Sequence, residues 1–96
     1  MPDTIADGQQ TTSPSVHTFT VIQQHVEEIV TVTDGQILDA MDYLFRYQRQ
    51  IVEPSGASAL AALLSGEVKP AGDRIGVIIS GGNISPVRFI ELMADR

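Results

Sequence analysis

A serine followed by two glycines and an asparagine, Ser80-Gly81-Gly82-Asn83, is the first place where this 96-residue chain could do chemistry. It follows an apolar run, 74–80, and precedes a segment typical of a helix. In open α/β sheets, ligands bind beyond the carboxyl ends of the strands, where glycines let backbone N–H groups approach an anion or a ring. An ordinary turn that needs glycine for its dihedral angles would contain the same residues. The pattern is neither a Walker A motif nor the full dinucleotide fingerprint, so by itself it does not indicate a nucleotide.

A second polar cluster, Glu53-Pro54-Ser55-Gly56, precedes the most apolar segment of the chain. Taken alone, it is typical of a helix N-terminus. Ser55 would be the N-cap, Pro54 would set the backbone, and the Glu53 carboxylate would complement the helix dipole. Elsewhere, two histidines are eight residues apart with no further ligand at a suitable spacing, so we expect no metal site.

The charge balance argues against several classes of partner. Twelve acidic residues against 6 basic ones give a net charge of −6 and a pI of about 4.5. Nucleic acids and anionic membranes attract basic surfaces, so we expect neither as a partner. The chain has no cysteine, which excludes disulfides, thiolate nucleophiles and cysteine-ligated metals. It shows neither a basic leader nor an apolar run of the roughly 20 residues that span a bilayer, so the expected location is the cytoplasm.

Helices and strands must position these residues. Residues 1–16 are rich in Thr, Ser, Gln and Asp and are predicted to be an N-terminal arm or loop. Thr33 and Gln36 have the spacing of a capping box, and Ser85 and Pro86 fit the N-cap and first position of a helix. Apolar periodicity predicts four helices, over about 19–26 (with Thr18 as a possible N-cap), 34–49, 56–65 and 86–94. The β-branched segment 29–33 and the apolar run 74–80 are predicted strands.

This alternation predicts an α/β fold that is incomplete. A strand that is apolar on both faces needs helices above and below it and strands beside it. Two strands are too few, because isolated two-stranded sheets are only marginally stable. We therefore expect a part of a three-layer α/β/α domain, with about two strands and four helices.

Four segments, taken in order, are similar to the C-terminal third of a known enzyme group. They are 3–8, 18–33, 52–57 and 76–83. The group is that of the fold type II pyridoxal-phosphate (PLP) enzymes related to threonine dehydratase (threonine ammonia-lyase) and serine racemase. The resemblance covers essentially all 96 residues and keeps the order and approximate spacing of the motifs. It implies that residues 17–96 are the C-terminal part of the PLP-binding α/β domain, preceded by the arm.

The resemblance implies a PLP-binding role for five residues. Ser80 would place its hydroxyl at the pyridine nitrogen, and Gly81 and Gly82 would keep side chains away from the cofactor. Gly8 would lie against one face of the ring, and Glu53 would lie near the pyridine side. A hydroxyl is a poor proton donor, so the ring nitrogen would not be firmly protonated, which suits elimination of the hydroxyl group of serine or threonine. The resemblance assigns no catalytic step and no metal ligand to these 96 residues.

Other features of the family are absent from these 96 residues. In the family, the lysine that binds the cofactor, a tetraglycine phosphate loop and an acidic cation site lie upstream. Lys69, the only lysine here, lies in a predicted surface loop beside Pro70. The expected function is therefore that of the C-terminal fragment of a PLP-dependent L-threonine/L-serine dehydratase, which forms a 2-oxo acid and ammonia. We expect the chain alone to be inactive and to need an N-terminal family segment, or to self-associate.

Three alternatives stay open. The chain could be a fragment of a serine racemase-like isomerase, or a stand-alone remnant that acts as a binding or interaction module. It could also be an unrelated protein that binds nucleotide phosphates through its glycine loop. The loop that holds the substrate carboxylate and the base on the opposite face of the ring would separate dehydratase from racemase, and neither is found in these 96 residues.

Overall fold

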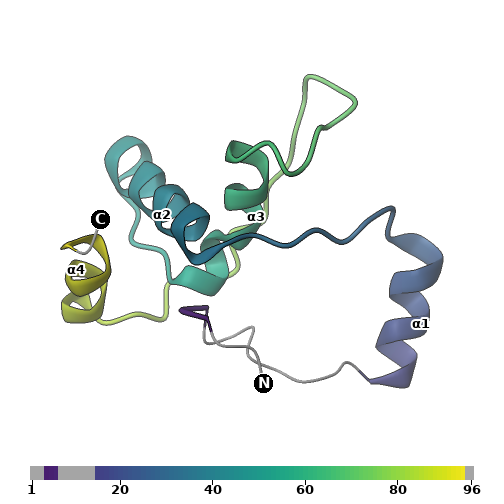
Figure 1. Cartoon of the computed structure of the whole chain (residues 1–96), viewed down its shortest axis with the longest axis horizontal. Helices are drawn as coiled ribbons and strands as arrows, with labels where there is room; N and C mark the ends of the chain where they lie inside the picture. Colours follow the sequence, from purple (N-terminus) through teal and green to yellow (C-terminus); the bar gives the residue numbers. More distant parts are fainter. Residues whose placement is uncertain (1–3, 7–14, 95–96) are drawn as a thin grey trace.

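The computed structural model describes residues 4–6 and 15–94, which form four helices (Figure 1). Three helices lie together, and one stands apart at the end of an open segment. We call the three helices and the segments packed on them the body, and we call α1 with residues 26–31 the outlying region. The helices are α1 (Val16–His25), α2 (Asp34–Gln48), α3 (Pro54–Leu64) and α4 (Pro86–Ala94).

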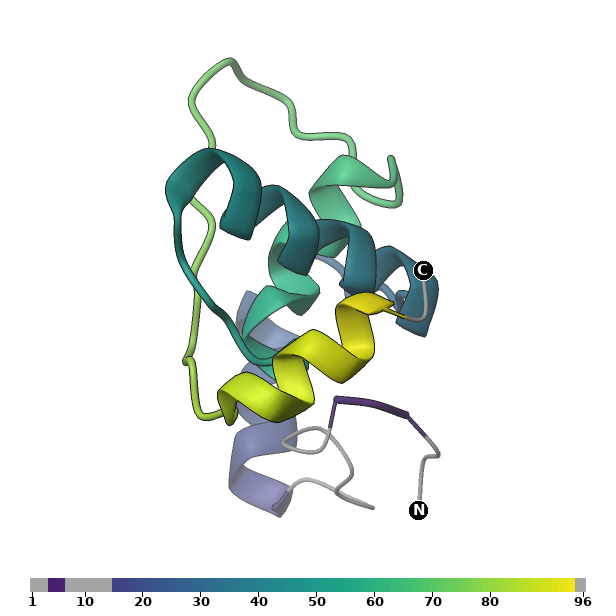
Figure 2. The same cartoon turned by 90° about the vertical axis from the view of Figure 1, so that its left-hand side faces the viewer.

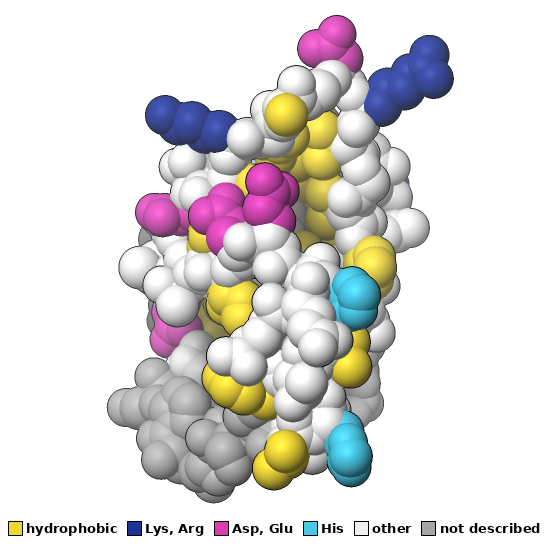
Figure 3. All heavy atoms as spheres, turned by 90° about the vertical axis from the view of Figure 1, so that its right-hand side faces the viewer, with side chains coloured by type: hydrophobic (Ala, Val, Ile, Leu, Met, Phe, Trp, Pro, Cys, Tyr) yellow, Lys and Arg dark blue, Asp and Glu magenta, His cyan; other side chains and the backbone are white. Residues whose placement is uncertain are grey.

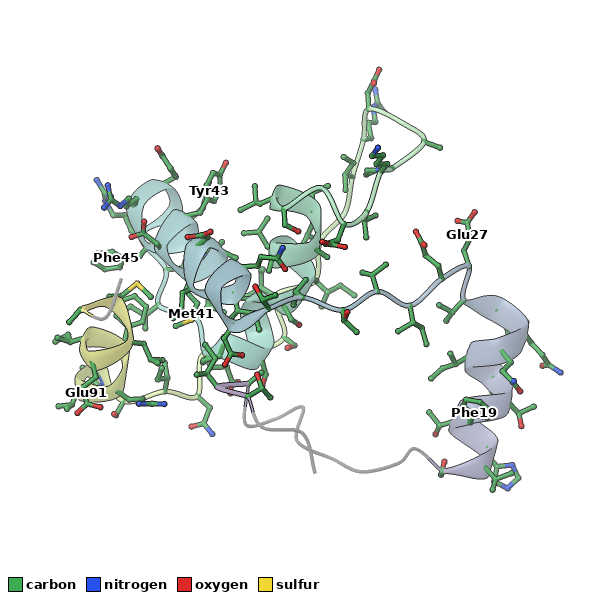
Figure 4. The ribbon with its side chains drawn as sticks, in the orientation of Figure 1. Phe19, Glu27, Met41, Tyr43, Phe45 and Glu91 are labelled. Carbon is green, nitrogen blue, oxygen red and sulfur yellow. The ribbon has the colours of Figure 1, made fainter. Side chains whose placement is uncertain are left out.

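The hydrophobic core lies around α2, which contacts both α3 and α4 (Figure 2). Met41 and Ile37 are the largest side chains that are fully buried. The rings of Phe45 on α2 and Phe89 on α4 have their centroids 5.4 Å apart, and Figure 4 shows Phe45 on the side of α2 that faces α4. The other buried members come from each of these helices, from the N-terminal arm and from the segment between α2 and α3: Ala40, Leu44, Ala57, Leu60, Ala61, Leu92, Ala6 and Val52.

The N-terminal caps of α2 and α4 confirm two sequence predictions. The backbone N–H of Gln36 donates to the Thr33 hydroxyl at 3.1 Å, and the Thr33 N–H donates to the Gln36 side chain at 2.9 Å. This is the predicted capping box, and the helix covers 34–48 against the predicted 34–49. At α4, the N–H of Arg88 donates to the Ser85 hydroxyl at 3.1 Å. Both helices begin where a polar side chain satisfies an N–H group that has no partner within the helix.

Helix α1 begins earlier than the sequence predicts. Its N-cap is Ser15, whose hydroxyl accepts a hydrogen bond from the N–H of Thr18 at 3.2 Å, so the prediction of Thr18 as the cap is wrong. No residue of α1 is buried, and α1 contacts no other described helix. Figure 3 shows apolar side chains and both histidines exposed on this face of the molecule. Across the described ranges, no helix is both long and apolar enough to cross a membrane.

The two predicted strands are not formed: within the described residues there is no strand. Segments 29–33 and 74–80 lie in open stretches of the chain (Figure 1). A helix satisfies its backbone internally, whereas a strand needs the backbone of a neighbouring strand, and no described segment pairs with either of these two as a strand. In the second segment Val77 and Ile79 are partly buried against the core, while Ile78 is 81% exposed. This alternation is that of a strand that lacks neighbours.

Candidate functional site

The two polar clusters of the sequence lie side by side in the body. The N–H of Glu53 donates to the carbonyl oxygen of Gly81 at 3.3 Å. A Cβ atom added to Gly82 would lie 2.9 Å from the carbonyl oxygen of Ile51, so these two backbones are also in close contact. Val52, which lies between Ile51 and Glu53 in the sequence, is 3% exposed and belongs to the core. The core therefore fixes the contact between residues 51–53 and residues 81–82.

Glycine is required at this contact because backbone meets backbone. A Cβ on Gly56, in the first turn of α3, would collide with the Gly81 carbonyl oxygen and lie 2.9 Å from Cγ1 of Val52. At Gly81 the contact is with a side chain instead: a Cβ there would lie 2.6 Å from Oε1 of Glu53, which would have to move. Among the described glycines, only Gly66 has a positive φ, at 83°. The alternative in which the glycines of the 80–83 turn serve its dihedral angles is therefore not supported, and close approach explains them.

Glu53 occupies the N-cap position of α3, and the prediction that Ser55 caps this helix is wrong. The helix begins at Pro54, because proline has no N–H and a φ suited to the first helical position. The carbonyl oxygen of Glu53 accepts hydrogen bonds from the N–H groups of Gly56 at 3.0 Å and Ala57 at 3.2 Å. Its side chain makes no capping hydrogen bond and instead lies against Gly81. A carboxylate there is stabilised by the helix dipole.

The hydroxyl of Ser80 is available to a ligand. Ser80 is exposed and follows the segment whose Val77 and Ile79 lie against the core. Its hydroxyl makes no hydrogen bond with any described residue. The structure thus brings Ser80, Gly81, Gly82 and Glu53 together, four of the five predicted site residues. The fifth, Gly8, lies outside the described residues.

A cavity of about 210 Å³ lies beside this contact, between the arm and the body. Ile5 of the arm, Glu53 and Asn83 all contribute to its wall. Its other lining residues are Pro54, Ile84, Ser85, Arg88 and Leu92. The sequence analysis assigned no role to Ile5, which lies in the motif segment 3–8, or to Arg88, which lies in no motif, because only the fold brings them to Glu53.

The remaining polar residues named from the sequence lie elsewhere. His17 and His25 are exposed on α1, in the outlying region (Figure 3). Lys69 is exposed in the loop after α3, as predicted. No group of three His, Asp or Glu side chains arranged to hold a metal ion is found in residues 4–6 and 15–94.

Comparison with known proteins identifies the family. The model of a family described as pyridoxal-phosphate dependent enzyme matches residues 1–81. Over 92 residues, the chain is 37% identical to an L-threo-3-hydroxyaspartate ammonia-lyase from a Pseudomonas species, covering 96% of this chain and 29% of that protein. Over 94 residues, it is 37% identical to the serine racemase of Schizosaccharomyces pombe, covering 98% of this chain and 29% of that protein.

A solved structure agrees with these matches. A threonine deaminase from T.th. superposes with a TM-score of 0.80 at 39% sequence identity, covering 88% of this chain and 30% of that one. The chain thus spans less than a third of the length of the relatives it matches.

The residues that the structure brings together suit one end of the cofactor that names this family. PLP has a pyridine nitrogen that takes a hydrogen bond, and a serine hydroxyl without another partner can donate one. Ser80 has such a hydroxyl, beside a glycine pair that leaves the backbone bare and next to a carboxylate at a helix N-terminus. With residues 1–81 matched by the family model and this arrangement present, the chain belongs to the family of pyridoxal-phosphate dependent enzymes.

Proposed function

We propose that this segment forms the pyridine-nitrogen side of the cofactor site in an L-threonine/L-serine dehydratase, an ammonia-lyase that releases a 2-oxo acid and ammonia. One observation supports this most directly: residues 80–82 lie against Glu53 at the N-terminus of α3, with the Ser80 hydroxyl exposed. The relatives named as ammonia-lyase and deaminase support the reaction class.

Each residue has a defined role in this proposal. When bound, PLP supplies a ring that withdraws electrons from the α-carbon of an amino acid. Ser80 orients the ring by donating to the pyridine nitrogen, and it keeps its proton because an alcohol is a weak acid. Gly81 and Gly82 let the backbone lie close to both the cofactor and residues 51–53. Glu53 holds this backbone in place from the side of α3. No residue of this segment makes or breaks a bond of the substrate.

The proposal includes a partner for the apolar surface that the chain leaves exposed. Ile78 is 81% exposed, Ile29 is 73% exposed and Val16 is 80% exposed. Soluble proteins rarely leave large contiguous apolar patches or unpaired strand-like segments in water. We propose that the part of the family fold with the cofactor-binding lysine covers these surfaces, so that residues 17–96 complete an α/β domain with the arm beside it. The threonine deaminase match, of which this chain covers 30%, supports this arrangement.

Replacing Ser80 tests the proposal. The Ser80→Ala variant is made in a protein that joins this segment to a lysine-bearing family segment. A buried ring nitrogen without its donor costs about 1–3 kcal/mol, which corresponds to a combined loss in PLP affinity and turnover of roughly 5- to 150-fold. PLP titration by fluorescence and 2-oxo acid release from threonine and serine measure the two parts. Ser65→Ala, an exposed serine after α3, is the matched control. Unchanged PLP affinity and turnover in Ser80→Ala would contradict the proposal.

A racemase is the second candidate, because the identity to the S. pombe serine racemase equals that to the Pseudomonas ammonia-lyase, 37% in both. The same joined protein, incubated with L-serine, separates the two reactions. A dehydratase accumulates pyruvate, whereas a racemase accumulates D-serine, which chiral chromatography resolves. The family match leaves no support for an unrelated nucleotide-phosphate binder.

A further inference from the structure

We infer that Asp34 is a positioning residue for the candidate site. Its carboxylate holds residues 4–6 of the arm on the body, and Ile5 among them lines the cavity beside Glu53. The inference rests on the proposed function, since it assigns the arm a part in cofactor binding. It concerns a residue that no motif marked, in contact with residues about thirty positions away in the sequence.

The carboxylate of Asp34 accepts hydrogen bonds from two consecutive arm residues. The hydroxyl of Thr4 donates to Oδ1 at 2.5 Å, and the N–H of Ile5 lies 3.4 Å from both oxygens. The N–H of Ala6 then donates to the Thr4 hydroxyl oxygen at 3.2 Å. Three successive residues are thus ordered by one carboxylate. Hydrogen bonds to an ionised acceptor are stronger than those between neutral groups.

Asp34 is not needed to cap its own helix. Thr33 and Gln36 form the complete capping box at the start of α2. Asp34 is the first residue of that helix, where the helix dipole favours a carboxylate. The cap and the contact with the arm are therefore made by different side chains, and mutation can separate them.

The arm is held by apolar contacts as well. Ala6 is 1% exposed and belongs to the core cluster, against which Ile5 is partly buried. Ile5, whose N–H faces Asp34, also lines the cavity with Glu53 and Asn83. The position of this cavity wall thus depends on the hydrogen bonds of Asp34.

The test compares four variants in the holoenzyme that contains this segment. Asp34→Ala removes the acceptor, and Thr4→Val removes one donor at nearly constant volume. Gln36→Ala removes the side-chain half of the capping box and leaves the arm contacts in place. Hydrogen exchange measured by mass spectrometry on the peptide with residues 4–6 reports the docking of the arm. PLP titration by fluorescence reports the site. Thr4→Ser, which keeps the hydroxyl, serves as the rescue variant.

Asp34→Ala is expected to speed exchange in residues 4–6 by about 10-fold and to weaken PLP binding by a similar factor, the size of effect that one hydrogen bond to a charged group produces. Thr4→Val should shift both readouts in the same direction, and Thr4→Ser should restore them. Gln36→Ala should leave both within about 2-fold of the parent protein, since a cap affects mainly the helix end.

Several results would overturn the inference. One is faster arm exchange in Asp34→Ala with unchanged PLP affinity, since the arm would then be irrelevant to the site. Another is an equal response to Asp34→Ala and Gln36→Ala, which would make Asp34 only a contributor to helix stability. If Asp34→Ala fails to fold, Thr4→Val decides in the same way. Absence of PLP binding in the parent protein would instead refute the proposed function, and the exchange data would still show whether Asp34 holds the arm.

Discussion

The body and the outlying region use the same local signals and reach different results. Helix α2 is capped by Thr33 and helix α1 by Ser15, each through a hydroxyl that accepts from the N–H three residues later. Yet α2 buries Ile37, Ala40, Met41 and Leu44, whereas α1 buries no residue. Figure 4 shows the labelled side chains of Phe19 and Glu27 far from those on α2 and α4.

The difference separates what makes a helix from what makes a domain. Capping and apolar spacing act within a few residues, so they produce helices wherever they occur. Burial needs a partner surface, and among the described helices only α2, α3 and α4 supply one another with it. The candidate site also has one part that is packed in the body and one part that lacks a partner surface. Its glycine contacts and Glu53 lie in the body, whereas the segment leading to Ser80 has one apolar face uncovered.

The largest expected effect comes from truncating a buried side chain of the body, compared with truncating an exposed one. Met41 is 0% exposed and Ile78 is 81% exposed. In the 96-residue chain, Met41→Ala should lower the free energy of unfolding by about 3 kcal/mol. Ile78→Ala should lower it by less than about 0.5 kcal/mol, because an exposed side chain loses little on truncation. Urea unfolding followed by circular dichroism measures both.

Ile78→Ala can also be measured in a protein that joins this segment to the lysine-bearing part of the family fold, where Ile78 should be covered. There, Ile78→Ala should cost about 2 kcal/mol or more, since a covered aliphatic side chain leaves a cavity when truncated. A cost that stays below about 0.5 kcal/mol in the joined protein would mean that nothing covers segment 74–80, and the proposed α/β domain would be wrong.

A smaller effect tests whether close backbone contact, rather than helix propensity, requires glycine at the site. Gly56 and Gly35 both lie in the first turn of a helix, but only Gly56 faces a backbone that a Cβ would strike. Gly56→Ala should cost about 2 kcal/mol, because the strain of overpacking exceeds the gain in helix propensity. Gly35→Ala, whose Cβ would lie 3.8 Å from the Thr33 hydroxyl, should raise stability by about 0.5 kcal/mol. Thermal unfolding of both variants decides, and equal signs would argue against the close contact at Gly56.

Sequence reasoning succeeded where the cause is local. The capping box of α2 and the Ser85 cap of α4 were predictable because each depends on residues three positions apart. The strands at 29–33 and 74–80 were predicted from their composition, but the described part of this chain has no neighbouring segment to pair with them. The N-cap of α3 is Glu53 rather than Ser55, because the preference of proline for the first helical position sets the start of the helix at Pro54.

The site was predictable in part, for a related reason. The motif resemblance named Glu53 and the turn at 80–82 as site residues, and the core, through Val52, brings these segments into contact. The contact of Asp34 with Thr4 could not be predicted, since it joins residues thirty positions apart whose spacing follows only from how the arm packs on α2. That Gly81 packs against Glu53 likewise depends on three-dimensional contact.

The smallest expected effect comes from removing the N-cap hydroxyls of Thr33 and Ser15. It tests most directly whether the outlying region is independent of the body. Removing an N-cap hydroxyl costs about 1 kcal/mol of helix stability wherever the cap lies. In Thr33→Ala this loss should appear in the cooperative unfolding of the body, because α2 is packed against α3 and α4. In Ser15→Ala the same loss should reduce only the helicity of residues 16–25 and leave the unfolding midpoint unchanged, because α1 buries nothing. Hydrogen exchange resolved by peptide separates the two regions, and urea unfolding reports the body. A lowered midpoint in Ser15→Ala would show that α1 packs on the body in solution. The apolar side chains of α1 would then be covered by this chain itself rather than by the lysine-bearing part.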